Sequence, residues 1–121
     1  MKVHEIMHDN INYYMECEYL KGGNLEEHIL ASKDGLDEHT AIYVVKDILL
    51  ALNYFHKKNI AHRDIKPDNI EFIYEENQGK ERRHVKVIDF GFSCFFDPYS
   101  GMHMNCGTPE FQAPELLKGT Y

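Results

Sequence analysis

The sequence predicts an α+β chain in which a pair of strands is followed by helices and then by further short strands. Apolar-rich stretches at 3–7 and 11–17 are separated by Asp9 and Asn10, a pair typical of turns, which indicates two antiparallel strands. Apolar residues later recur at spacings of three and four, as on the buried face of one long helix. They are Ala41, Val45, Ile48, Leu52 and Phe55.

Capping residues place the starts of two helices. Asn24 is followed three residues later by Glu27, the pattern of a capping box, and predicts a short helix that ends before Gly35. Asp37 is the expected N-cap of the long helix. Short strands are expected at 70–74 and 85–88, and the polar stretch 75–84 between them is expected to be a solvated loop because it contains Gly79 and mixed charges.

Composition excludes several functional classes. The chain has 43% hydrophobic and 27% charged residues, and it has no apolar run near the length of about 20 that a membrane span needs. A net charge of −7 argues against nucleic-acid binding, which needs clustered Lys and Arg, and is compatible with a basic peptide partner. Three cysteines without framework spacing and no signal-peptide pattern predict a cytoplasmic protein with reduced thiols. Oligomeric state is left open.

Three ordered motifs carry the functional prediction. The run 62–69 reads His-Arg-Asp-Ile-Lys-Pro-Asp-Asn, Asp-Phe-Gly follows at 89–91, and Ala-Pro-Glu follows at 113–115. In order and spacing the chain resembles a eukaryotic-type protein serine/threonine kinase, whose catalytic loop, metal-binding turn and activation-segment end have these sequences. The resemblance implies an enzyme that transfers the γ-phosphoryl group of ATP to Ser or Thr of a protein substrate.

The resemblance also implies the roles of individual residues. Asp64 orients the substrate hydroxyl and accepts its proton, and Lys66 presents a cation to the γ-phosphate. Thr108 hydrogen-bonds near both of them and, like Lys66, is typical of serine/threonine kinases. Asn69 and Asp89 are the expected ligands of Mg²⁺, and we expect Asp64, Asn69 and Asp89 to converge on one cleft.

The segment 15–25 resembles the hinge between the two lobes of a kinase. Backbone groups of Glu18 and Leu20 are then expected to read the adenine edge of ATP, with Cys17 at the gatekeeper position. Asn24 stands where many kinases carry a glutamate that contacts ribose and basic substrates. The alternative interpretation of this segment is an edge strand that runs into a glycine turn.

The resemblance implies a partial kinase-like fold. Residues 1–17 correspond to small-lobe strands, 18–24 to the hinge and 25–121 to the first half of the large lobe, up to the Ala-Pro-Glu motif. No G-x-G-x-x-G loop or V-A-I-K lysine is present, so the chain alone is expected to be inactive. Met104 occupies the position of the usual phosphorylated residue of the activation segment, a pattern nearest to calcium/calmodulin-dependent-type kinases.

Other functions remain open at this point. A kinase-like module that binds a partner without catalysis is the main alternative, and a small-molecule kinase is disfavoured by the Ala-Pro-Glu segment. His4, Glu5 and His8 fit the H-E-x-x-H zinc motif of metalloproteases, although that motif needs a helix. A zinc site formed by Cys94, His103 and Cys106 would lack a fourth ligand at a recognisable spacing.

Overall fold

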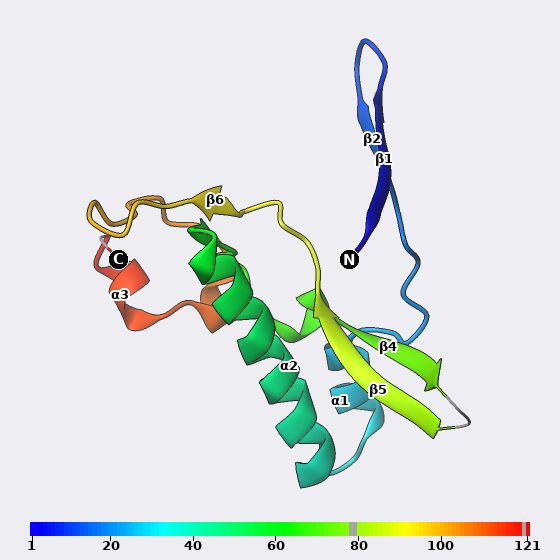
Figure 1. The fold of residues 1–121 in the computed structure, drawn as a ribbon. Helices are drawn as coiled ribbons and strands as arrows, with labels where there is room; N and C mark the ends of the chain where they lie inside the picture. Colours follow the sequence, from blue (N-terminus) through cyan, green and yellow to red (C-terminus); the bar gives the residue numbers. More distant parts are fainter. Residues whose placement is uncertain (78–79, 120) are drawn as a thin grey trace.

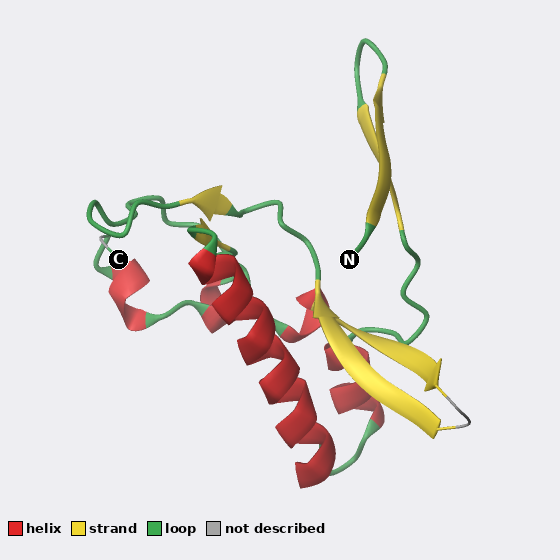
Figure 2. Cartoon of the chain, in the orientation of Figure 1, coloured by secondary structure: helices red, strands yellow, loops and turns green. Residues whose placement is uncertain are grey.

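The protein combines two long strand hairpins with one long helix and a largely irregular C-terminal segment (Figures 1 and 2). The structure, a computed structural model, describes residues 1–77, 80–119 and 121. Its helices and strands are β1 (Val3–His8), β2 (Tyr13–Cys17), α1 (Leu25–Ala31), α2 (Glu38–Lys57), β3 (Ile60–Ala61), β4 (Ile70–Asn77), β5 (Lys80–Val87), β6 (Cys94–Phe95) and α3 (Pro114–Leu117). Within these residues no helix has the length and apolarity needed to cross a membrane.

The N-terminal hairpin confirms the predicted strand pair. β1 and β2 are antiparallel, and the turn between them is closed by Asp9, whose Oδ1 accepts hydrogen bonds from the backbone N–H groups of Ile11 and Asn12, both at 2.7 Å. The hairpin extends away from the rest of the molecule (Figure 1). His4 and His8 therefore lie on a strand, which excludes the helix that a zinc-binding H-E-x-x-H motif needs.

Both predicted helix starts are confirmed. The Asn24 side chain accepts a hydrogen bond from Glu27 N (2.8 Å), and the Glu27 side chain accepts one from Asn24 N (3.1 Å), which completes the capping box of α1. At the start of α2 the Asp37 side chain accepts hydrogen bonds from the backbone N–H and the hydroxyl of Thr40. These caps fix the residues at which α1, after the hinge segment, and α2, after α1, begin.

The expectation of a solvated loop at 75–84 was wrong. β4 and β5 continue into this stretch and pair in antiparallel register from Ile70↔Val87 to Asn77↔Lys80. Charged residues can form strands when apolar residues further along the hairpin set the pairing. The loop prediction considered only the composition of 75–84 and ignored the apolar residues of the flanking strands. Gly79, the residue that suggested a loop, lies outside the described residues.

The hydrophobic core lies between α1, α2 and one face of the β4–β5 hairpin. Its buried members are Leu25, Val44, Ile70, Phe72, Val85 and Val87. The predicted core face of α2 is displaced by one residue at its centre, because Val44 is 2% exposed whereas Val45 is 53% exposed. α2 carries apolar residues on two sides, and spacing alone does not say which side packs on the strands.

Ile70 is the most deeply buried core residue, at 1% exposed. We expect Ile70→Ala to lower the free energy of unfolding by about 2–5 kcal/mol, because the truncation removes apolar burial and leaves a cavity. Urea unfolding of the longest chain that contains these residues measures the change. Ile11→Ala, at a position 87% exposed in the β1–β2 turn, is the matched control. An equal loss in both variants would contradict this description of the core.

Candidate functional site

The catalytic-loop motif, residues 62–69, follows β3, and its histidine joins it to the end of β5. His62, 2% exposed, donates from Nε2 to the Ile88 carbonyl (2.9 Å), and its Nδ1 accepts from Asp64 N (3.3 Å). Arg63 between them has a φ of 69°, in the left-handed region that non-glycine residues rarely adopt. Such strained backbone is common at functional sites, where the surroundings fix an unusual side-chain direction.

Asp64 is the centre of a hydrogen-bond network. Its Oδ1 accepts hydrogen bonds from both the backbone N–H and the hydroxyl of Thr108, each at 2.8 Å. Its Oδ2 accepts one from Asn69 Nδ2 (3.0 Å) and lies 3.6 Å from Lys66 Nζ. Lys66 Nζ also donates to Thr108 Oγ1 (2.9 Å). Four of the predicted site residues therefore share one network, which joins Asp64, Lys66 and Asn69 of one short run to the distant Thr108.

The network keeps the Asp64 carboxylate ionised. Asp64 is only 5% exposed, and this burial alone would raise its pKa. The two hydrogen bonds from Thr108, the charge of Lys66 and the hydrogen bond from Asn69 outweigh burial and hold the pKa of Asp64 below its usual range. A buried and ionised carboxylate with an ordered environment is suited to accept a hydrogen bond from a substrate hydroxyl.

Asn69 and Asp89 lie at the same end of the β4–β5 hairpin. Asn69 directly precedes β4, Asp89 follows shortly after β5, and Ile88 N donates to the Asn69 carbonyl (2.9 Å). Asp89 has a φ of 56° and accepts a hydrogen bond at Oδ1 from Gly91 N (3.0 Å). Asn69 also contacts Asp64. Asp89 follows Ile88, whose backbone N–H contacts Asn69, and convergence of all three side chains on one cleft stays a prediction.

Aromatic packing joins the metal-binding turn to the catalytic loop. The ring of Phe90 lies edge-on to His62, with centroids 4.9 Å apart, and to Phe55 of α2, at 5.1 Å. Edge-to-face pairs of this kind contribute stability beyond area burial. Phe90 therefore packs against both the catalytic loop and α2, although it remains 37% exposed.

The segment after the metal-binding turn returns to the catalytic loop at Gly107. A Cβ at this position would lie 2.3 Å from the Arg63 carbonyl oxygen, and the φ of 91° also favours glycine. Gln112 fixes the same loop by donating from Nε2 to the carbonyls of Cys106 and Gly107 (3.1 and 3.2 Å). A cavity of about 190 Å³ lies beside Asp64, with lining residues Arg63, Asp64, Ile65, Thr108, Phe111, Gln112, Ala113 and Leu116.

Hydrogen bonds from Arg63 and Tyr121 hold the segment between the metal-binding turn and Gly107. Arg63 Nε donates to the Phe92 carbonyl (2.6 Å), and the Tyr121 hydroxyl donates to the carbonyl of Met104 (2.7 Å). Met102 and Tyr121 exchange two backbone hydrogen bonds (2.6 and 3.1 Å). The segment is thereby held to the catalytic loop and to Tyr121.

The hinge segment contacts the β4–β5 hairpin through a lysine that the sequence reasoning missed. Lys86 Nζ binds both carboxylate oxygens of Glu18, at 2.8 and 2.9 Å. Gly22 N donates to the Phe72 carbonyl (3.2 Å), so the hinge residues run along the free edge of β4. Leu20 is partly buried, and the side-chain oxygen of Asn24 is used in capping α1.

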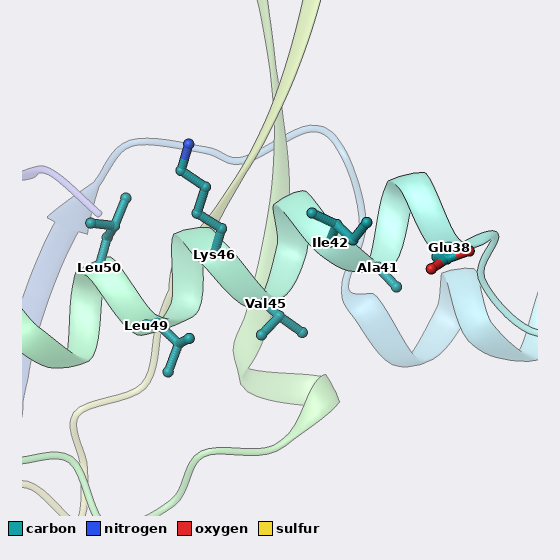
Figure 3. A pocket seen from close by; sticks show the side chains of 7 residues that line it. All are labelled: Glu38, Ala41, Ile42, Val45, Lys46, Leu49 and Leu50. Atoms are coloured by element: carbon teal, nitrogen blue, oxygen red, sulfur yellow. The ribbon is translucent and has the colours of Figure 1, made fainter.

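A further hollow lies away from these residues. It is a shallow apolar groove of about 590 Å³ on the outer side of α2 (Figure 3). It is lined by Glu38, Ala41, Ile42, Val45, Lys46, Leu49 and Leu50. Its lining is mainly apolar, with Glu38 and Lys46 as the charged members, so it offers few groups that could act on a substrate.

Neither zinc alternative gains support. Within the part of the chain that the structure describes, no group of three or more His, Cys, Asp or Glu side chains is arranged to hold a metal ion. The Cys94 thiol instead contacts the sulfur of Met102 at 3.7 Å.

Comparison with known proteins gives a consistent result. The family model described as the protein kinase domain matches residues 1–121. The chain is 39% identical to calcium-dependent protein kinase 4 of Plasmodium falciparum over its whole length, and it covers 22% of that protein. It is 34% identical over 119 residues to the SNF-related serine/threonine-protein kinase of Homo sapiens, of which it covers 15%. The chain thus spans less than a quarter of the length of these curated relatives.

Proposed function

We propose, because this chain belongs to the protein kinase family, that its protein transfers the γ-phosphoryl group of ATP to Ser or Thr hydroxyls of protein substrates. The observation that carries the proposal is the network in which Asp64 is bound by Thr108, Asn69 and Lys66. Phosphoryl transfer needs little covalent chemistry from the protein, and depends on positioning and charge. A network of this kind supplies both.

Asp64 is proposed to orient the acceptor hydroxyl and to take its proton. Lys66, held between Asp64 and Thr108, would place a positive charge near the transferring group. Asn69 and Asp89 suit Mg²⁺, since they offer an amide oxygen and a carboxylate, the hard oxygen ligands that this ion prefers. Asn69 binds Asp64 through its Nδ2, which leaves its Oδ1 for the metal. When bound, Mg²⁺ supplies positive charge that neutralises the phosphate oxygens.

The adenine end of ATP is proposed to bind at the hinge. Backbone groups of Glu18 and Leu20 would read the base, and Asn24 would lie near the ribose. The Lys86 contact with Glu18 supports this proposal because it fixes the start of the hinge against the hairpin whose end carries Asn69 and Asp89.

Serine and threonine are the preferred acceptors in this proposal. Lys66 and Thr108, the two residues typical of serine/threonine kinases, are bonded to each other and to Asp64. The adjacent cavity is lined in part by Phe111, Ala113 and Leu116, which suits an apolar side chain next to the acceptor residue of the substrate.

Transfer of labelled phosphate from ATP to peptides tests the proposal on the longest chain that contains these residues. We expect Mg²⁺-dependent labelling of Ser and Thr peptides, and at least tenfold weaker labelling of matched Tyr peptides. Labelling that persists after removal of divalent cations, or that favours Tyr, would contradict the proposal. Nucleotide binding without any transfer would instead favour the alternative of a kinase-like binding module.

A further inference from the structure

The end of the hinge is bound to the free edge of β4. Gly22 N donates to the Phe72 carbonyl (3.2 Å), and Phe72 N donates to the Gly23 carbonyl (2.9 Å). A Cβ at residue 22 would lie 2.3 Å from the Phe72 carbonyl oxygen, so this close approach requires glycine. The two hydrogen bonds place this contact two residues after Leu20, a residue proposed to read adenine.

A histidine on α1 makes a third contact with the same turn. His28 Nε2 lies 2.7 Å from the Gly22 carbonyl oxygen, in a partly buried position. A carbonyl oxygen can only accept a hydrogen bond, so Nε2 carries the proton and donates it. The His28 ring also packs on the ring of Phe72, with centroids 4.3 Å apart. α1, which packs against β4 (Figure 1), thus supplies a donor that is already held in place before it binds the hinge.

The carbonyl that His28 binds belongs to the part of the hinge with the fewest steric restraints. It lies in the peptide unit between Gly22 and Gly23, and Gly23 has a φ of 73°. Neighbouring glycines can adopt many backbone conformations, so the orientation of this peptide unit depends on contacts from outside. A hydrogen bond to its carbonyl fixes that orientation. It also restrains the residues just before it, since only Lys21 separates Gly22 from Leu20.

We propose that His28 is a positioning residue for the nucleotide: its hydrogen bond to the Gly22 carbonyl holds the hinge in the conformation that presents the backbone of Leu20 to adenine. The inference rests on the proposed function, because it uses adenine binding at the hinge. His28 acts through the backbone of the hinge. A backbone that is ordered before binding loses less conformational entropy when the ligand arrives, and this strengthens binding.

Two variants separate the hydrogen bond of His28 from its packing. His28→Leu keeps an apolar contact with Phe72 and removes the donor, whereas His28→Gln keeps a donor of similar reach and removes the ring. We expect His28→Leu to raise KM for ATP by about threefold to tenfold, the range for one lost hydrogen bond, and His28→Gln to change KM by less than about twofold. We expect kcat to stay within about twofold in both, because contacts to adenine are equally strong before and during transfer.

Labelled phosphate transfer to a Thr peptide, on the longest chain that contains these residues, measures both constants. A purely structural role of the ring predicts the opposite order, with His28→Gln the more damaging change. That order would overturn the inference, and so would equal KM values in His28→Leu and the unsubstituted protein. His39→Leu, an exposed histidine in the first turn of α2, is the matched control and should change KM by less than about twofold.

Two partial ligands locate the effect within the nucleotide. Adenosine contains the base that the hinge is proposed to read, and inorganic triphosphate with Mg²⁺ contains only the phosphates. We expect His28→Leu to weaken binding of adenosine by the same factor as binding of a non-hydrolysable Mg·ATP analogue, and to leave triphosphate binding unchanged. Equal weakening of adenosine and triphosphate would indicate a general disturbance of the site and would overturn the inference.

Amide hydrogen exchange gives a readout that needs no nucleotide. Exchange reports local opening of the backbone, so we expect residues 18–24 to exchange faster in His28→Leu than in His28→Gln or in the unsubstituted protein. Exchange in β5 should be the same in all three proteins, which shows that the variants are folded. Equal exchange of 18–24 in all three proteins would contradict a role of His28 in ordering the hinge.

The same titrations separate failure of this inference from failure of the proposed function. If the unsubstituted protein binds the Mg·ATP analogue and Asp89→Asn weakens that binding, the proposed nucleotide site stands. A His28→Leu variant that then binds the analogue as tightly as the unsubstituted protein overturns only the role of His28. If the unsubstituted protein binds no nucleotide, both the role of His28 and the proposed function are overturned.

Discussion

Replacing Asp64 by Asn is expected to lower the rate of phosphoryl transfer by about 100- to 10,000-fold, the range typical of a lost general base. Asn at this position can still accept the two hydrogen bonds from Thr108 through Oδ1. It cannot accept the substrate proton. In Asp64 the oxygen Oδ2 accepts from Asn69 Nδ2 and lies near Lys66 Nζ. In the Asn variant this oxygen is replaced by the donor Nδ2, which would face those two donors without an acceptor. Labelled phosphate transfer to a Thr peptide measures the loss.

Two controls make the Asp64→Asn result specific. Asp34→Asn removes an exposed carboxylate and should leave the rate unchanged. The pH dependence of stability gives a second readout. The pKa of Asp64 is lower in the folded state than its unfolded value of about 3.9, so ionised Asp64 stabilises the folded protein above that pH. This stabilisation is lost as pH falls through the folded pKa. Asp64→Asn should therefore be less stable than the original protein at pH 7 and equally stable at strongly acidic pH. Undiminished transfer would overturn the assignment of the base.

The proximity of residues within the catalytic-loop motif could be predicted from the sequence. His62, Asp64 and Asn69 are in one short run, so their proximity follows from chain connectivity, and the capping residues Asn24 and Asp37 act within one helical turn. These features join residues that are close in sequence, so the rules for helix capping and short motifs are enough to predict them. The contact of Thr108 with Asp64 is long-range, and only the family resemblance predicted it.

The features that sequence reasoning missed depend on long-range pairing. Nothing near Lys86 in sequence indicates Glu18 as its partner, because their contact joins the hinge to a distant hairpin. The pairing of Glu71 with Lys86 depends on strand register, which the expected loop at 75–84 left unspecified. A one-residue change in register would turn Glu71 to the core face, so the face on which it lies follows only from the structure.

The second large effect expected is loss of activity in the polypeptide 1–121 when it is tested alone. Its sequence has no G-x-G-x-x-G loop and no V-A-I-K lysine, the parts that hold the phosphates of ATP in kinases. Without them the γ-phosphate is not aligned with Asp64, and alignment is a major part of catalysis. We expect transfer to a Thr peptide at background level, and measurable transfer by a longer chain that includes those parts.

The outer face of α2 requires a control for folding in this experiment. Ile42, Val45 and Leu49 are 62%, 53% and 59% exposed, and an apolar surface of this kind promotes aggregation (Figure 3). A 1–121 variant with Ile42→Lys and Leu49→Glu should remain monomeric by light scattering and should still be inactive, because the substitutions do not supply groups that hold phosphate. Inactivity in this soluble variant separates missing phosphate contacts from misfolding. Transfer by the soluble variant, abolished by Asp64→Asn, would show that residues 1–121 position ATP without those parts.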